Sequence, residues 1–318
     1  MSDVRAQLRG GFIEGVKKGW SGFVWMCKIV IPLSFIISIF QWTGWLSHLD
    51  FLLTPLTNLI NLPPEAALPI IAGMVLNLYA CIAIVTVVPF TIGQMTLIAV
   101  FTLIAHNLIT EGIIQHRSGI NAVKISIIRI VAAVVAVLIV SRFLGDTSQS
   151  VALPASLVVQ APFFNVVGEW AAGTLGLLAK IFGIIMGLMV ILSWLQALGW
   201  IDPLLKVFKP LMRILGLPEG TAMMCMTGIL FGVFYGGAVI VEETKKKTFK
   251  KDELERLHIS IGINHAMVED PALFVVLGLN AFWMWVPKIT MAIVAVQVYR
   301  LYTYLRNKLF QNSAGIIA

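Results

Sequence analysis

The segment QWTGWLSHLDFLLTPLTNLINLPPEAALPIIAG, residues 41–73, recurs 155 positions later as QALGWIDPLLKVFKPLMRILGLPEGTAMMCMTG, residues 196–228. Ten of the 33 aligned positions are identical, and no gap is needed. The identities include residue types that a hydrophobic composition does not match by chance: Gly44/Gly199, Trp45/Trp200, Pro55/Pro210, Pro63/Pro218 and Gly73/Gly228. At a shift of 159, residues 119–139 align with 278–298, and His106 aligns with His265. The chain therefore contains two copies of one structural unit.

The composition indicates which kind of unit this is. Of 318 residues, 58% are hydrophobic and only 12% are charged, and the mean hydropathy is +0.91. Soluble domains carry roughly 45–50% apolar and about 25% charged residues, so we predict an all-α polytopic membrane protein. The three cysteines are too few for a disulfide scaffold. Because the sequence holds no phosphate-binding loop, nucleophile elbow or dinucleotide fingerprint, we expect neither an enzyme nor a cofactor.

Six stretches are long enough to cross the hydrocarbon as helices, which takes about 20 residues. They are Gly22–Gln41, Thr91–Ile114, Asn121–Phe143, Leu175–Leu198, Arg256–Leu277 and Asn280–Leu301. Two further apolar stretches, Pro64–Val88 and Glu219–Val241, are interrupted by glycine. In the fourth stretch, Gly183 and Gly187 form a GxxxG pattern that is typical of close helix packing.

The distribution of Lys and Arg predicts the orientation of these stretches. The net charge is +7, and the basic residues gather in short segments between apolar runs, as in loops that face the cytoplasm and its anionic lipid. We therefore expect the bilayer, and no nucleic acid polymer, as their partner. If Pro64–Val88 and Glu219–Val241 crossed the membrane, basic segments would be exported. Both are better interpreted as re-entrant hairpins, so that each copy has three spans and one hairpin and the copies are inverted repeats.

The predicted organisation has five parts. They are a basic cytoplasmic N-terminus (1–20), a first repeat (21–143), a non-cytoplasmic linker (144–174), a second repeat (175–303) and a cytoplasmic C-terminal tail (304–318). Both termini are then on the cytoplasmic side.

Each copy carries an acid and a base within its predicted spans, where a charged side chain is energetically costly. Glu111 and Arg129 are 18 residues apart, as are Asp270 and Lys288. Each pair is symmetric about an inter-helix turn, so an antiparallel helix pair places its acid and base at one depth, about 13 Å from the turn. Such charges mark a pathway, an ion pair or both. We predict Arg129 and Lys288 as buried charge partners of the two acids.

Polar residues also cluster in INHAMVEDP, residues 263–271, ahead of a proline that frees a backbone carbonyl, which predicts a broken helix. On a regular helix, His265 and Glu269 would share one face, as would His106 and Thr110. Two polar residues, Asn77 and Tyr235, lie near the presumed hairpin tips. The predicted substrate-binding residues are therefore Asn77, His106, Asn107, Glu111, Tyr235, Asn264, His265, Glu269 and Asp270.

Two segments carry a family resemblance: IAHNLITEG, residues 104–112, and INHAMVEDPALF, residues 263–274. On these the chain resembles the bacterial nucleoside-recognition, or Gate-domain, membrane proteins, with two Gate-like units over most of residues 20–300. That family is similar to concentrative nucleoside transporters, to the gate segments of ferrous-iron transport proteins and to spore-maturation membrane proteins. The resemblance implies a multi-pass protein of the bacterial plasma (inner) membrane. It also implies nucleoside-like contacts at Glu111, Asn264 and Glu269.

We accordingly predict a secondary transporter, or permease, of a small polar solute, nucleoside-like at best guess, that works by alternating access and is coupled to H⁺ or Na⁺. A homo-oligomer is compatible with this prediction. One alternative is divalent metal cation transport with His106, Glu111, His265 and Glu269 as ligands. Another is a non-transporting membrane scaffold or assembly factor of the spore-maturation type, in which the basic segment Lys245–Arg256 contacts a partner.

Overall fold

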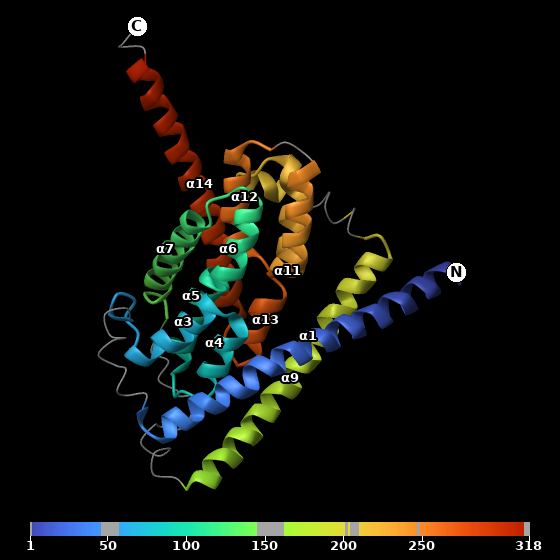
Figure 1. Ribbon diagram of the computed structural model, residues 1–318, viewed down its shortest axis with the longest axis vertical. Helices are drawn as coiled ribbons and strands as arrows, with labels where there is room; N and C mark the ends of the chain where they lie inside the picture. Colours follow the sequence, from blue (N-terminus) through green and yellow to red (C-terminus); the bar gives the residue numbers. More distant parts are fainter. Residues whose placement is uncertain are drawn as a thin grey trace.

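The structure is a computed structural model that describes residues 2–45, 57–144, 162–200, 203, 210–246 and 249–314. These residues are almost entirely helical and contain no β-strand. The elements are α1 (Ser2–Trp42), η2 (Pro64–Ala66), α3 (Ala67–Val75), α4 (Leu78–Val85), α5 (Ile92–Ala105), α6 (Leu108–Arg117), α7 (Ala122–Val140), α9 (Phe163–Ala197), η3 (Glu219–Thr221), α11 (Ala222–Lys246), α12 (Lys251–Asn264), α13 (Glu269–Val276) and α14 (Ala281–Ala314). Figure 1 shows their arrangement.

Six helical segments are long and apolar enough to cross a membrane: Val4–Trp42, Ile92–Arg117, Ala122–Val140, Phe163–Ala197, Lys251–Val276 and Ala281–Leu309. They coincide with the six predicted spans, which confirms an all-α polytopic membrane protein. The predicted bounds were too short at α1, α9 and α14. About 20 residues are enough to cross the hydrocarbon, but a helix can extend beyond the hydrocarbon on either side. Most of the predicted 1–20 and 304–318 tails and the end of the 144–174 linker are helical, and residues 145–161 and 315–318 lie outside the described residues.

The first interrupted stretch folds back on itself. Helix α3 has nine residues and α4 has eight, and only Leu76 and Asn77 separate them. The side chain of Asn77 caps α4 by accepting a hydrogen bond from Ala80 N at 3.0 Å. A Cβ atom on Gly73 would lie 3.3 Å from the Cβ of Cys81, so the two helices touch. Each is about 12–14 Å long, less than half of a bilayer's hydrocarbon, as the predicted hairpin requires.

The second interrupted stretch folds back within α11. Gly232 has φ 71° and ψ −172°, a conformation that only glycine adopts easily, and it divides the helix. A Cβ atom on Gly220, before α11, would lie 3.9 Å from Phe249, beyond its end. A straight helix would separate these two residues by about 40 Å. The chain therefore turns back at Gly232, the position that aligns with Asn77 of the first hairpin.

The two repeats run in opposite directions. Lys124, at the start of α7, lies 3.0 Å from the Glu255 carboxylate at the start of α12 and 3.3 Å from the Tyr299 hydroxyl in the second half of α14. The end of α6 thus lies beside the beginning of α12, and α7 is antiparallel to α14. In Figure 1 these helices form the central bundle, with the α3–α4 hairpin and α11 on either side of it. The repeats are inverted, as the distribution of basic residues predicts.

The duplication extends to unusual backbone conformations. Four pairs of aligned residues share a positive φ: Gly44/Gly199, Asn61/Gly216, Asn107/Ala266 and Gly119/Gly278. In two of these pairs, Asn61/Gly216 and Asn107/Ala266, the residue types differ, so the common fold imposes the positive φ there.

Helices α1 and α9 form an antiparallel pair that crosses the bundle (Figure 1). Three glycines of α1, at positions 11, 15 and 19, face α9 closely, and a Cβ atom on Gly15 would lie 2.5 Å from Val190 Cα. Gly183 and Gly187 make no close packing contact with the described residues of this chain, because a Cβ atom on either meets nothing within 4 Å there. Close approach needs the glycines on the facing side of one helix only, and here that helix is α1.

We expect Gly15→Ala to destabilise the protein. The added methyl group would overlap backbone atoms of α9, and overpacking of this kind costs about 1–3 kcal/mol. Gly10→Ala on the same helix meets open space and keeps only the gain in helix propensity, up to about 1 kcal/mol. Thermal unfolding in detergent should therefore give a lower melting temperature for Gly15→Ala than for Gly10→Ala. Equal melting temperatures would contradict the α1–α9 contact.

Candidate functional site

The second and fifth spans are each broken near their middle. Helix α5 ends at Ala105 and α6 begins at Leu108, with Asn107 at φ 57°. Helix α12 ends at Asn264 and α13 begins at Glu269, with Ala266 at φ 46°. The second break was predicted, whereas the first carries no proline and was not. Because the helices are interrupted, the predicted i, i+4 pairs His265/Glu269 and His106/Thr110 do not share a helix face.

The hairpins occupy the space that the breaks open. Asn107 N donates to Gly73 O at 2.9 Å, and Ala266 N donates to Gly228 O at 3.0 Å. The glycines are needed because a Cβ atom on Gly73 would lie 3.0 Å from Thr102, and one on Gly228 would lie 2.9 Å from Ile261. The aligned Gly73 and Gly228 of the duplicated segment therefore bring each hairpin against its broken helix.

The buried bases satisfy the carbonyl groups that the breaks leave free. Arg129 Nη2 donates to His106 O at 2.8 Å, and Lys288 Nζ donates to His265 O at 2.7 Å. Pro271 frees the carbonyl of Met267, which accepts from Trp285 Nε1 at 2.7 Å. Arg129 is on α7 and Lys288 is on α14, so these hydrogen bonds tie each broken span to the span that follows it.

The same bases pair with the predicted acids. Arg129 Nη1 lies 2.8 Å from Glu111 Oε2, and Lys288 Nζ lies 3.4 Å from Asp270 Oδ2. Arg129 is 0% exposed and Lys288 is 1% exposed. Buried ions of this kind need a partner, because desolvation costs several kcal/mol per ion. These ion pairs therefore hold α6 against α7, and α13 against α14, at the depth of the breaks.

The two histidines meet where the repeats meet. His106 Nε2 and His265 Nε2 are 3.0 Å apart, and both rings are buried. Each histidine also lies near the acid of the other repeat: His106 Nε2 is 3.4 Å from Asp270 Oδ2, and His265 Nε2 is 3.6 Å from Glu111 Oε1. His106, His265 and Asp270 offer ligand atoms within 4.8 Å of one another, so they could hold a metal ion. The two acids of the predicted ligand set, Glu111 and Glu269, are not part of this group.

A pocket of about 500 Å³ opens beside the histidines. Both hairpin tips and both helix breaks contribute to its wall, and α1 and α9 complete it. Its lining residues are Ser21, Gly22, Trp25, Asn77, Leu78, Tyr79, His106, Asn107, Met189, Gly232, His265, Ala266, Glu269 and Asp270.

Six of the nine predicted substrate-binding residues line this pocket: Asn77, His106, Asn107, His265, Glu269 and Asp270. Glu111 lies behind His265 and lines a smaller cleft toward α11. Asn264 is buried outside the pocket wall. The Tyr235 side chain lies outside the described residues.

The sequence did not point to Tyr79 or Trp25. The Tyr79 hydroxyl donates to Glu269 Oε1 at 2.6 Å, joining the first hairpin to the second broken helix, and the Trp25 ring lies 5.9 Å from the Tyr79 ring. A signal for Tyr79 exists in hindsight, because it is a hydroxyl-bearing residue two positions after Asn77 in an otherwise apolar hairpin. Nothing separates Trp25 from the other tryptophans of the chain.

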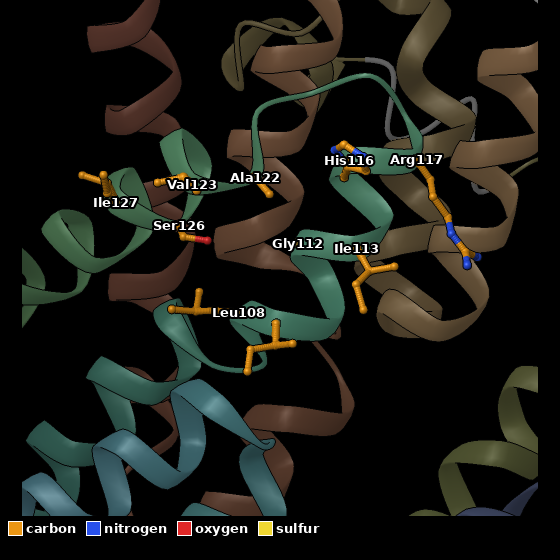
Figure 2. Close-up of a pocket in the computed structure, with 10 residues that line it drawn as sticks. Leu108, Gly112, Ile113, His116, Arg117, Ala122, Val123, Ser126 and Ile127 are labelled. Atoms are coloured by element: carbon orange, nitrogen blue, oxygen red, sulfur yellow. The ribbon is translucent and has the colours of Figure 1, made fainter.

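A second pocket of about 500 Å³ lies between α6 and α7 and has a different character (Figure 2). Its wall is formed mainly by exposed apolar side chains such as Ile109, Ile113, Val123 and Ile127. His116 and Arg117 stand at its rim, at the end of α6. An apolar, outward-facing groove suits lipid chains better than a polar solute, so we do not assign the solute site here.

Comparison with known proteins adds one relative. The chain is 28% identical over 286 residues, 89% of this chain and 91% of the other, to a protein of Bacillus subtilis (strain 168) described as "Uncharacterized membrane protein YvoD". No protein-family model matches the chain. No solved structure matches it either. The likeness agrees with a membrane protein over nearly the whole length, and the resemblance to Gate-domain proteins stays a prediction.

We expect Arg129→Met to destabilise the protein by about 3–5 kcal/mol, because it leaves the Glu111 carboxylate buried without its partner. The double variant Arg129→Met/Glu111→Gln should be more stable than Arg129→Met alone, since the second change removes the uncompensated charge. Chemical or thermal unfolding of the purified protein measures both. An additive double variant would show that the two charges are not coupled.

Proposed function

We propose that this protein is a secondary transporter, or permease, of a small polar solute, and that it works by alternating access without a catalytic step of its own. The observation that carries the proposal is the placement of the pocket. Both hairpin tips and both helix breaks border it, and they come from two inverted repeats. Broken helices at the interface of inverted repeats are where secondary transporters bind their substrates.

The pocket's chemistry favours a neutral or cationic polar solute. Its described wall offers amides at Asn77 and Asn107, a carboxylate at Glu269 and a hydroxyl at Tyr79, and it includes no Lys or Arg. The Arg129 and Lys288 cations lie behind the histidines and are bonded to acids and carbonyls. Groups of this kind bind ligands through paired hydrogen bonds. A volume of about 500 Å³ is within the usual range for small-molecule sites.

A nucleoside-like solute is the best match to this chemistry. The Trp25 ring at the pocket wall provides a flat surface against which a base can stack, and the amides and the carboxylate can pair with the edge of a base or with ribose hydroxyls. The resemblance to nucleoside-recognition proteins supports the same solute class. Coupling to H⁺ or Na⁺ through the carboxylates completes the proposal.

Two sets of contacts between the repeats are candidates for the moving parts. Tyr79 and Glu269 connect them at the pocket. Lys124, Glu255 and Tyr299 connect them at the end of the bundle where α6 stops and α12 begins, and there the Tyr299 hydroxyl donates to Glu255. Alternating access requires such contacts to break and form in turn on the two sides of the site.

The test is flux into proteoliposomes against a panel of nucleosides and other small polar solutes. Glu269→Gln should lower the flux of the transported solute at least about 10-fold, because hydrogen bonds to charged groups contribute about 1.5–3 kcal/mol. Glu14→Gln, which changes an exposed carboxylate on α1, is the matched control and should leave flux unchanged.

Two results would count against the proposal. Flux that neither Glu269→Gln nor Glu111→Gln alters would remove the assigned site. The absence of flux for every solute in the panel would favour a scaffold over a transporter.

A further inference from the structure

The two histidines present their lone pairs to the same point. His106 Nδ1 lies 2.8 Å from Thr102 O, and His265 Nδ1 lies 3.0 Å from Ile261 O. A carbonyl oxygen only accepts, so each Nδ1 carries the proton and each Nε2 of a neutral ring has a lone pair. These two Nε2 atoms are 3.0 Å apart, so their lone pairs repel each other unless a cation lies between or beside them.

Two carboxylates lie beside the histidines. Asp270 Oδ2 lies 3.4 Å from His106 Nε2 and 4.0 Å from His265 Nε2, and Glu111 Oε1 lies 3.6 Å from His265 Nε2. Glu111 Oε1 is buried and has no hydrogen-bond partner among the described residues. It is therefore an unpaired acceptor close to His265, and it remains unexplained by the Arg129 ion pair, which uses Oε2.

The spacing is that of donors around one metal ion. Zinc binds imidazole nitrogen at about 2.0–2.1 Å and carboxylate oxygen at about 2.0–2.2 Å, so two ligands of a tetrahedral ion lie about 3.3–3.5 Å apart. The three separations among His106 Nε2, His265 Nε2 and Asp270 Oδ2 run from 3.0 to 4.0 Å. A backbone carbonyl on the second ring nitrogen is also the usual outer contact of a metal-binding histidine, because it fixes the tautomer.

The bases behind the acids act as outer contacts as well. Arg129 orients Glu111, and Lys288 orients Asp270. The two positive charges of these bases balance the two negative charges of the acids, and Glu269 adds one negative charge to the same pocket. A proton shared by the two Nε2 atoms would relieve their repulsion without using the Asp270 carboxylate. One metal ion uses all three donors.

We infer that His106, His265 and Asp270 bind one divalent transition-metal ion of the Zn²⁺ or Co²⁺ type, with the Glu111 carboxylate beside His265. The first repeat supplies one ligand and the second repeat supplies two, so the ion bridges the two inverted repeats. Because His106, His265 and Asp270 line the pocket, the ion reaches the site through it. The site exists whatever solute the protein carries, since its ligands are assigned without reference to that solute.

The experiment is a Co²⁺ titration of the full-length protein, purified in detergent and first treated with a chelator. Binding of about one Co²⁺ per chain should produce the visible absorption of a tetrahedral complex with nitrogen and oxygen ligands, and Zn²⁺ should abolish it by displacement. His106→Asn and His265→Asn should each weaken binding at least about 100-fold, because loss of outer contacts alone costs about 10–100-fold. His258→Asn changes a buried histidine of the same helix as His265 outside the group and should bind like the unaltered protein.

Several outcomes would overturn the inference. One is the absence of Co²⁺ absorption from the unaltered protein, and another is normal Co²⁺ binding by His106 and His265 variants that elute as folded protein. If neither histidine variant folds, Asp270→Asn replaces them, and undiminished binding there has the same meaning. Flux without Co²⁺ binding removes the metal site alone, whereas Co²⁺ binding without flux removes the transporter alone.

Discussion

Two cations buried at mid-depth determine much of this structure. Arg129 and Lys288 are almost wholly withdrawn from solvent, which costs several kcal/mol per ion unless each is paired. Each is stabilised by an acid and by a carbonyl group that a helix break leaves free. The break and the base therefore depend on each other: a continuous helix would offer no free carbonyl, and a break without the base would leave a carbonyl unsatisfied in an apolar slab. The hairpin glycines then supply acceptors for the amide groups at the same breaks.

Because the unit occurs twice in opposite directions, its charged centre occurs twice as well. The two centres meet at the histidines, and each histidine approaches the acid of the other repeat. The pocket is thus a consequence of the repeat: hairpin tips and helix breaks that are required for stability inside each unit become the wall of a cavity between units. A site at the interface between the two units changes its exposure when the units move relative to each other, which is the physical basis of the proposed transport.

The duplication, the six spans and the charge pairs could be predicted from the sequence, because each depends on a local property: hydropathy, identity at fixed spacing or the rarity of charge in an apolar run. The break at Asn107 could not, since no proline or glycine marks it and its hydrogen-bond partners, Arg129 at His106 O and Gly73 O at Asn107 N, are distant in the sequence. Helical spacing also put His265 beside Glu269 although the second break separates them, whereas the structure puts His265 beside Glu111, and Glu269 accepts a hydrogen bond from Tyr79. Helical periodicity cannot predict contacts between residues that are 159 or 190 positions apart in the sequence. The alignment of His106 with His265 nevertheless pointed to one such pair of equivalent residues.

The inverted arrangement of the two repeats is the central claim, and the sidedness of two equivalent positions tests it most directly. Asn121 follows the turn after α6, Asn280 follows the turn after α13, and both are exposed and aligned in the duplication. Single cysteines at these positions, in a background with serine at Cys27, Cys81 and Cys225, can be labelled in intact cells and in inverted vesicles with a membrane-impermeant maleimide. The account predicts that position 121 is labelled from the cytoplasmic side and position 280 from the opposite side. Labelling of both from one side would contradict it.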